Sequence, residues 1–380
     1  MTAIDVRPVP DAEAVAAAVA AALRTIDANL AAFGKRYPGD TTVRGRYPLR
    51  EANEGWTTSF WPGMLWLAHA LTDDRRYHDA ALGHVGSFSD RIRSRHDVDT
   101  HDLGFLYTLS CVTPWKIAGD ASAREAALAA ADHLVTRVLP AAGIIQAWGD
   151  MDDPRQQGRT IIDSLMNTPL LFWAGAESDK PDLSEIARRH AAQLRDHILR
   201  PDGTTYHTFY WDGVTGEPLR GETEQGSADD SCWARGQAWG IYGFALNHRY
   251  TGDPTLLDAA RRCADRFLSH LPADGVAYWD LEFGDGSGEE RDSSAAAIAV
   301  CGLLELGGLL EVGGERYRSA ALRILGSLID GYAATESALL RHGVYDKPKG
   351  IGVDEGTLWG DYFYLEALTR VTRPAWKDHW

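Results

Sequence analysis

Apolar residues recur at helical spacing along nearly the whole chain. Segments with apolar side chains near positions i, i+3, i+4 and i+7 are predicted to be amphipathic or buried helices. Twelve such segments are found, at 11–33, 60–72, 76–94, 102–118, 122–138, 163–177, 182–199, 233–251, 254–271, 292–311, 315–334 and 358–371. Segments rich in Gly, Pro, Asp and Trp separate them. The pattern predicts an all-α protein.

The predicted helices are of two kinds, and the two kinds alternate. One kind has a charged face and a stripe of apolar residues, as in LSEIARRHAAQLRDHIL at 183–199. The other is apolar nearly all round, as in AAAIAVCGLLEL at 295–306, and such helices are buried. Six alternations predict an inner ring of six helices wrapped by an outer six. We therefore expect an (α/α)6 barrel, a six-hairpin toroid, forming a single domain over residues 1–380.

The segments that precede the inner helices carry most of the chemically versatile side chains. Because all inner helices run in the same direction, their N-termini meet at one end of the barrel, where loops carry function. These segments include GWTTSFWPGM (55–64), THDLGFLY (100–107), IIQAWGD (144–150), RTIIDSLMN (159–167), YHTFYWD (206–212), SCWARGQAW (231–239) and LWGDYFY (358–364). The sequence thus predicts one pocket lined by Trp, Tyr, His, Asp and Arg.

Charge and cysteine content narrow the class of protein. The formal net charge of −16 makes nucleic acid and anionic membrane surfaces poor partners. The four cysteines form no C-x-x-C pair, so buried reduced thiols are expected rather than a disulfide framework or a metal site. No sequence pattern typical of a metal or organic cofactor was found, and we expect the protein to need neither.

The N-terminal segment is apolar but does not have the pattern of a signal peptide. Asp5, Asp11 and Glu13 stand where such a peptide needs basic residues, so an amphipathic helix is expected. No run approaches the ~20 apolar residues of a membrane span. We interpret the chain as a soluble cytoplasmic protein without a membrane partner.

Asp102 and Asp163 are the candidate catalytic residues. Both stand at predicted N-termini of inner helices, where aspartate is also a preferred cap, and position alone does not separate capping from catalysis. Each lies in an otherwise apolar tract, and both are expected to face the same cavity beside tryptophans. A carboxylic acid against apolar walls has a raised pKa and can act as a general acid. Paired carboxylates of unequal environment are typical of carbohydrate-processing enzymes.

Other residues in these loops are candidates for binding. Trp56 and Trp148 lie among Gly, Asp and Thr and are the better candidates for stacking on sugar rings. Arg235, in the first turn of an apolar helix, needs an anion; a substrate carboxylate or an ion pair with Asp229 or Asp230 are the alternatives. Candidate hydrogen-bonding residues are His207 and Gln225.

Three of these segments, THDLGFLY, RTIIDSLMN and SCWARGQAWGIYGF, resemble those of the unsaturated glucuronyl hydrolases, glycoside hydrolase family 88. The resemblance covers nearly the whole chain. The sister family of unsaturated rhamnogalacturonyl hydrolases, family 105, has a similar aspartate arrangement, but W-x-x-x-F-W-P-G-M and R-G-Q-A-W favour family 88.

The resemblance implies roles for individual residues. Asp163 would be the general acid and base, and Asp102 would assist it. The implied substrate-binding residues are Trp56, Trp148, His207, Gln225, Arg235, Trp239 and Tyr345. The segment VYDKPKG at 344–350 would cover the far end of the substrate, and Asp346 stands there in place of the histidine expected in some relatives.

The implied reaction removes a 4,5-unsaturated uronic acid from the non-reducing end of oligosaccharides made by polysaccharide lyases. Asp163 would protonate C4 of the vinyl ether, and water activated by the same residue would attack C5. The alternatives are a rhamnogalacturonyl-type hydrolase and a non-catalytic oligosaccharide-binding barrel. The polysaccharide source, the linkage and sulfation preferences, and the choice between monomer and homodimer are left open.

Overall fold

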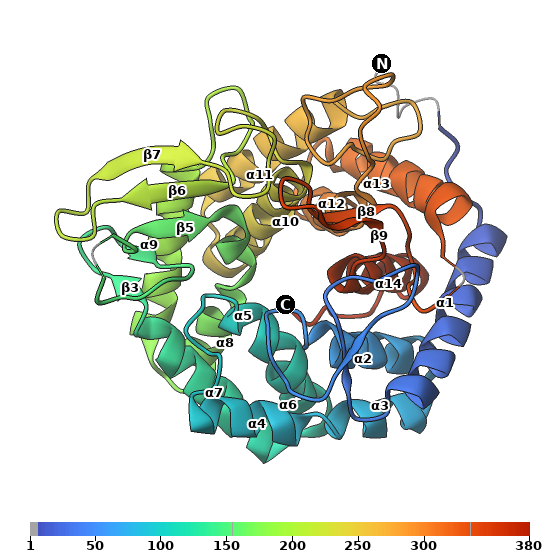
Figure 1. Cartoon of the computed structure of the whole chain (residues 1–380), viewed down its shortest axis with the longest axis horizontal. Coiled ribbons are helices and arrows are strands. Elements are labelled where there is room, and N and C mark those ends of the chain that lie inside the picture. Colours follow the sequence, from blue (N-terminus) through green and yellow to red (C-terminus); the bar gives the residue numbers. More distant parts are fainter. Residues whose placement is uncertain (1–6, 154, 335) are drawn as a thin grey trace.

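The helices of the computed structural model form two concentric rings (Figure 1). The structure describes residues 7–153, 155–334 and 336–380. The inner ring consists of α2 (Phe60–Thr72), α5 (Leu103–Tyr107) with its continuation α6 (Thr113–Ala118), α8 (Pro169–Glu177), α10 (Ala234–Thr251), α12 (Ser293–Leu309) and α14 (Leu358–Thr372). The outer ring consists of α1 (Ala12–Phe33), α3 (Arg75–Leu82) with α4 (Val85–Ser94), α7 (Ala121–Val135), α9 (Pro181–His197), α11 (Pro254–Ser269) and α13 (Gly314–Ser327). The predicted (α/α)6 barrel is confirmed.

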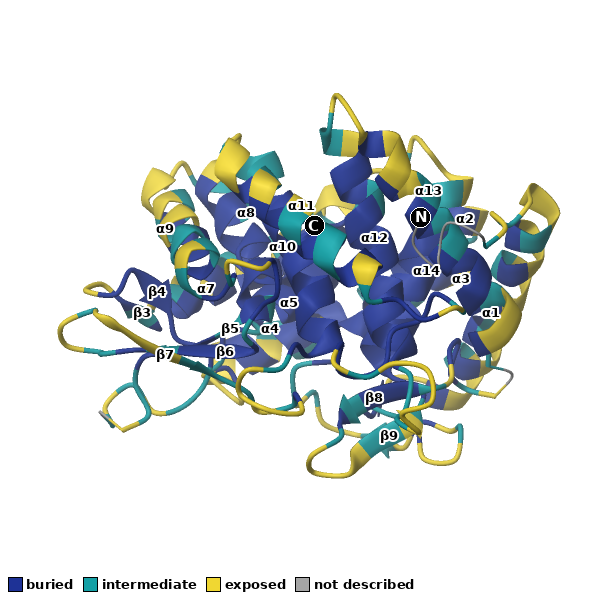
Figure 2. Cartoon of the chain, turned by 90° about the horizontal axis from the view of Figure 1, so that it is seen from above, coloured by how far each residue is buried: buried dark blue, intermediate teal, exposed yellow. Residues whose placement is uncertain are grey.

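The two rings reflect the two helix patterns in the sequence. Residues 234–247 of α10 and 293–303 of α12 are buried without a break, as expected for helices that are apolar on every side. In contrast, α11 buries only a stripe that includes Leu256, Ala260, Cys263 and Phe267. Figure 2 shows this contrast as continuous burial inside the ring and exposed surfaces around it.

Three predicted helices are interrupted in the structure. Segment 76–94 divides at Gly83–His84 into α3 and α4. Segment 102–118 contains a π-helical stretch, η2 (Thr108–Val112), between α5 and α6. Segment 163–177 begins as a 3₁₀ turn, η3 (Ile162–Met166), before α8 begins at Pro169. Proline favours the first turn of a helix, because its missing N–H would have no intrahelical partner there, so Pro169 marks a new start.

Short antiparallel strands, which the periodicity did not predict, gather at one end of the barrel (Figure 2). They pair as β1 (Tyr37–Pro38) with β2 (Leu49–Arg50), β3 (Val138–Leu139) with β4 (Ile144–Ile145), β5 (Arg159–Ile161) with β6 (Thr208–Trp211) and β7 (Pro218–Glu222), and β8 (Gly343–Asp346) with β9 (Ile351–Glu355). Segments of two to five residues are too short to show strand alternation. They connect outer helices to inner ones and shape the mouth of the barrel.

The last residues of the chain close the opposite end, where the inner helices finish. The ring of Trp380 stacks on Phe363 with centroids 5.9 Å apart, and its Nε1 donates to Glu366 Oε2 at 2.9 Å. Asp378 accepts hydrogen bonds from Arg249 of α10 and Arg370 of α14. The last residues thus pack against the inner helices at the end of the barrel opposite the strands.

The N-terminal helix departs from one expectation. Among the described residues, α1 is the only helix long and apolar enough to cross a membrane, whereas no such run was expected. In the structure its buried residues, which include Val15, Ile26 and Phe33, belong to the core cluster of the barrel. The four cysteines are buried and free, as expected.

Candidate active site

A cavity of about 330 Å³ opens at the strand-bearing end of the barrel. All nine predicted site residues line it, although they come from segments far apart in the sequence. The lining consists of Trp56, Thr100, His101, Asp102, Trp148, Ile161, Asp163, His207, Glu224, Gln225, Trp233, Arg235, Trp239, Tyr345 and Lys349. The expected pocket is thus present, and the loops before the inner helices supply most of it.

A close approach of two loops brings Asp102 and Asp163 together. A Cβ on Gly104 would lie 2.2 Å from Cα of Asn167, so only glycine fits between the start of α5 and the turn before α8. Asn167 then accepts a hydrogen bond from the Phe105 N–H at 2.7 Å, and its side-chain amide donates to the Asp163 carbonyl at 3.4 Å. This contact fixes the two aspartate-bearing segments against each other.

Neither aspartate side chain acts as a helix cap. Asp102 occupies the N-cap position of α5, but it makes no capping hydrogen bond; its Oδ2 accepts from the Thr100 hydroxyl at 2.8 Å instead. Asp163 lies inside η3, where Ile161 is the residue before the first turn. Asp163 therefore lies in the first turn of a helical segment, as expected, but it is not the N-cap residue, and capping does not account for either carboxylate.

Asp163 is held in a setting that favours its protonated form. Its side chain is 14% exposed, and Oδ1 is buried without a hydrogen-bond partner. Burial raises the pKa of Asp163 well above its usual value, and the negative charge of Asp102 raises it further, while Arg235 acts in the opposite direction. A carboxyl group in such a site can be protonated near neutral pH and donate that proton.

His101 lies between the two carboxyl groups. Its Nε2 is 3.3 Å from Asp102 Oδ1 and 3.5 Å from Asp163 Oδ1. The side chain is 2% exposed, and this burial lowers its pKa, so the imidazole is neutral at pH 7. Because both carboxyl oxygens face Nε2, the geometry favours a proton on that nitrogen. Sequence reasoning missed His101, although it directly precedes Asp102.

Arg235 is buried at the base of the cavity and pairs with an unexpected partner. Its guanidinium bonds Asp292 Oδ2 at 3.2 Å, Gln225 Oε1 at 2.5 Å and the carbonyls of Val344 and Tyr345. The side chain is 2% exposed. The alternative of an ion pair with Asp229 or Asp230 is wrong, because Asp292, which caps α12, occupies that role. The positive charge of Arg235 still acts on Asp163, where it partly offsets the rise in pKa caused by burial and by Asp102.

His207 and Gln225 are fixed by the loop between β7 and α10. His207 Nδ1 accepts the N–H groups of Glu224 and Gln225 at 3.0 and 3.1 Å, so its proton is on Nε2. Burial and the charge of Arg235 lower the pKa of His207 to about 3. A neutral imidazole with Nε2–H can donate to a ligand oxygen.

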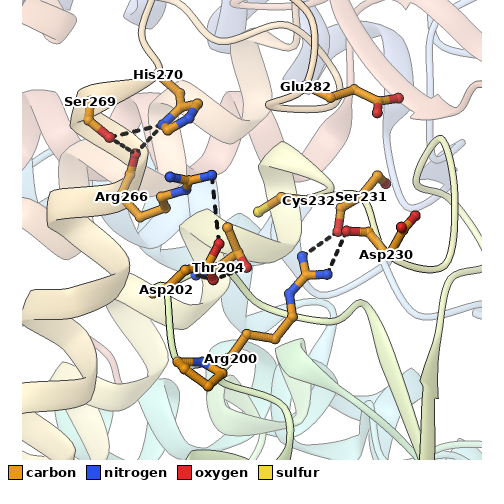
Figure 3. Close-up of polar contacts among 12 residues, drawn as sticks. Arg200, Asp202, Thr204, Asp230, Ser231, Cys232, Arg266, Ser269, His270 and Glu282 are labelled. Carbon is orange, nitrogen blue, oxygen red and sulfur yellow. Dashed lines mark hydrogen bonds and ion pairs between the residues drawn. The ribbon is translucent and has the colours of Figure 1, made fainter.

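The loop that leads into α10 is also held from outside the cavity. The Arg200 guanidinium donates to the Asp230 carbonyl at 2.6 Å and to the Ser231 carbonyl, as Figure 3 shows. Asp280 accepts hydrogen bonds from Ser227 and Ser231 on the other side. These contacts fix the segment just before Trp233 and Arg235.

Aromatic rings form the remaining walls. Trp56 is half-buried and packs against Trp359, with centroids 5.1 Å apart, and its Nε1 donates to the Tyr345 hydroxyl at 3.1 Å. Trp239 is buried beneath them against Phe105. Trp148 stands at the rim with the Arg159 guanidinium 5.2 Å from its ring centre. Flat apolar faces of this kind suit the C–H faces of sugar rings.

Two further charged residues at the mouth were not predicted. Lys349, in the turn between β8 and β9, donates to Asp346 Oδ2 at 2.9 Å, and Glu224 lines the cavity with it. Nothing in their local sequence distinguishes them from surface charges. Among the described residues, no group of three or more His, Cys, Asp or Glu side chains is arranged to hold a metal ion.

An acid of raised pKa beside a second carboxylate, under aromatic walls on an (α/α)6 barrel, defines a glycoside hydrolase type of site. Comparison with known proteins agrees with this class: the family model described as Glycosyl Hydrolase Family 88 matches residues 31–370. The chain therefore belongs to glycoside hydrolase family 88, and the resemblance to family 88 rather than family 105 is confirmed.

The similar proteins cover almost the entire chain. An unsaturated glucuronyl hydrolase of Bacillus sp. strain GL1 is 45% identical over 94% of this chain and 96% of its own length, and its crystal structure gives a TM-score of 0.91. An unsaturated chondroitin disaccharide hydrolase of Streptococcus pneumoniae is 44% identical over 98% of this chain and 95% of its own length. The unsaturated glucuronyl hydrolase of Streptococcus agalactiae is 43% identical over 98% of this chain and 95% of its own, with a TM-score of 0.95.

Proposed function

We propose that this protein is an unsaturated glucuronyl hydrolase that removes a 4,5-unsaturated uronic acid from the non-reducing end of lyase-generated oligosaccharides. The observation that carries the proposal is the buried Asp163, whose Oδ1 has no hydrogen-bond partner and whose pKa is raised by burial and by Asp102. Family membership and the relatives named above support the same activity.

The reaction begins with protonation of the double bond. Asp163 delivers its proton to C4 of the unsaturated ring, and the π electron pair of the C4=C5 double bond forms the new C–H bond while the C4–C5 single bond remains. Positive charge then develops at C5 and is shared with the ring oxygen. Because Asp163 has become a carboxylate, the same group can stabilise this charge and accept a proton in the next step.

Water completes the reaction. Asp163 removes a proton from a water molecule, whose oxygen bonds to C5 and forms a hemiketal. The hemiketal opens at its bond between C5 and the ring oxygen, which leaves a ketone at C5 and a hemiacetal at C1. Collapse of this hemiacetal to an aldehyde breaks the C1–O bond to the next sugar and releases the rest of the oligosaccharide as an alcohol. One molecule of water is consumed, and Asp163 ends protonated, as it began. Attack at C5 differs from ordinary glycoside hydrolysis, in which the anomeric carbon is attacked.

The surrounding residues position the substrate and maintain the proton balance. Burial raises the pKa of Asp163, and the negative charge of Asp102 raises it further. We assign binding of the sugar to Trp56, Trp148, Trp239 and Tyr345 through their rings, and to His207 and Gln225 through hydrogen bonds. Arg235 supplies positive charge near the carboxylate of the unsaturated ring.

Replacement of Asp163 by asparagine tests the proposal. The double bond of the substrate absorbs ultraviolet light, so hydration is followed directly as loss of absorbance. We expect wild type to consume an unsaturated disaccharide, and Asp163→Asn to lose at least about 10³-fold in kcat while still binding it. Activity of the variant equal to wild type would refute the role of Asp163. Binding without turnover by wild type would instead identify a non-catalytic oligosaccharide-binding barrel.

We also propose four properties of the protein as a whole. They are a single domain over residues 1–380, a cytoplasmic location, no membrane or nucleic-acid partner, and a monomer or homodimer. The substrate class that the relatives' names suggest is the unsaturated disaccharides from glycosaminoglycans, chondroitin among them. A panel of lyase-made disaccharides, read by absorbance loss, distinguishes the possible sources.

A further inference from the structure

A row of alternating aromatic and guanidinium groups leads outward from the cavity. Arg159 of β5, Tyr210 of β6 and Arg220 of β7 lie directly opposite one another in the sheet. Cζ of Arg159 is 5.8 Å from the ring centre of Tyr210, and Cζ of Arg220 is 4.8 Å from it. Because Arg159 also packs against Trp148 at 5.2 Å, the row begins at the cavity rim. We call Trp148, Arg159, Tyr210 and Arg220 the outer platform.

The outer platform is continuous with the cavity wall. Side chains two positions apart along a strand point to the same face of the sheet, so Arg159 shares a face with Ile161, which lines the cavity. Figure 1 shows β6 and β7 reaching outward beside β5 from the ring of helices. A substrate too long for the cavity therefore meets this face of the sheet when it leaves past Trp148.

Arg159 differs from the other arginine of the platform. Arg220 forms an ion pair with Glu222, whereas Arg159 forms none with any residue in the described ranges, and its Nε is buried without a hydrogen-bond partner. A guanidinium that stacks on aromatic faces keeps its edge N–H groups free for a carboxylate. In a chain with a net charge of −16, an arginine without a carboxylate partner beside the cavity points to an anionic ligand.

We propose that Arg159 on the outer platform binds the carboxylate of the third sugar in longer substrates. This inference rests on the proposed function. In a polymer that alternates uronic acids with amino sugars, a lyase leaves the unsaturated ring at position one. The next carboxylate is then on the third sugar, two rings away from Asp163. Trp148 and Tyr210 hold the guanidinium between them, and Arg220 adds positive charge on the outer side.

Three substrates separate this role from a general effect on the site. They are an unsulfated unsaturated disaccharide, the unsulfated tetrasaccharide with a uronic acid as its third sugar, and a tetrasaccharide in which only neutral sugars follow the unsaturated ring. We expect Arg159→Gln to lower kcat/KM for the uronate tetrasaccharide, relative to the disaccharide, by about tenfold. This loss should come from a higher KM for the uronate tetrasaccharide, and it should become smaller as salt concentration rises. The kcat/KM of the neutral tetrasaccharide, relative to that of the disaccharide, should stay as in wild type.

Two variants serve as controls. Arg188→Gln removes an equal charge from the outer helix α9, where Arg188 pairs with Glu185, and should leave all three ratios as in wild type. Arg159→Lys keeps the charge and should restore part of the lost preference.

Several results would overturn the proposal. Equal losses on all three substrates would mean that Arg159 only supports Trp148, and an unchanged ratio would mean that it meets no third sugar. A loss seen only with a sulfated tetrasaccharide would assign it to sulfate instead of the carboxylate. Failure of wild type to consume any of these substrates would contradict the proposed function itself.

Discussion

His101 and Asp163 are held with Nε2 and Oδ1 3.5 Å apart, and the same nitrogen lies 3.3 Å from Asp102. The imidazole is buried, and its Nδ1 has no hydrogen-bond partner. A neutral imidazole packed between two carboxyl groups can keep them in place without adding charge. We interpret His101 as a positioning residue for the proton chemistry of Asp163.

Replacement of His101 should therefore affect kcat more than KM. We expect His101→Ala to lower kcat by about 10- to 100-fold with little change in KM, because the two carboxyl groups lose the buried imidazole that lies between them and fixes their positions. Glutamine can place an N–H near the position of Nε2, so His101→Gln should recover part of the loss. Steady-state kinetics on an unsaturated disaccharide measures both parameters. Equal losses in the two variants would contradict a positioning role for the N–H group at this place.

Asp102 should control the pH dependence of the reaction. Its negative charge is one cause of the raised pKa of Asp163, so Asp102→Asn should lower that pKa. Protonated Asp163 is needed for the first step, and activity falls as pH rises through its pKa. The alkaline limb of the kcat profile should therefore move to lower pH in the variant. Asp99→Asn, at an exposed position, is the control and should leave the limb in place. A limb that stays or moves upward in Asp102→Asn would be inconsistent with this coupling.

The ion pair of Arg235 and Asp292 should be important for stability as well as binding. Both side chains are buried, and Asp292 also accepts the Ser294 N–H that begins α12. Asp292→Ala removes this cap and leaves a buried guanidinium without its charge partner, which should cost about 3–5 kcal/mol in free energy of unfolding. Asp292→Asn retains an oxygen acceptor and should cost less. Urea denaturation of the two variants checks the order, and the reverse order would refute this account.

Asp361 should make stability depend on pH. It is buried in α14, accepts hydrogen bonds from the Tyr47 hydroxyl and the Leu340 N–H, and burial raises its pKa to about 7. The folded state then holds a proton that the unfolded state releases above pH ~4. Stability from this group is fully present below about pH 4 and is lost as pH rises toward 7.

Asp361→Asn stays neutral at every pH and removes this dependence. The variant should gain stability relative to wild type as pH rises from about 4 to 7, by an amount of at most about 4 kcal/mol. Denaturant midpoints of both proteins across this range measure the difference. A difference that is the same at every pH would mean that Asp361 does not titrate there.

The spacing of apolar residues along the chain predicted the barrel well, because in a helix the buried positions recur with the period of the helix. The bounds of α2 were predicted at residues 60–72 and found there, since its apolar run is long and bounded by polar turns. The break before Pro169 was missed, because an apolar pattern runs through η3 and α8 alike. The short strands were missed because two to five residues carry no period. The helix α1 is long and apolar enough for a membrane span, because alanines, which are small and apolar, also occupy its less buried face.

The sequence by itself determined the double ring and the end at which the pocket opens, because helix direction and amphipathicity are local properties. Its motifs also identified nine of the residues that line the pocket. Only the tertiary structure decided which of these groups touch. Asp102 and Asp163 both lie beside His101 Nε2 because Gly104 lets α5 approach Asn167. Arg235 pairs with Asp292 rather than with Asp229 or Asp230, which are nearer in sequence. The registers of β5, β6 and β7 align the outer platform. Such contacts depend on packing between segments distant in sequence, and no local periodicity encodes them.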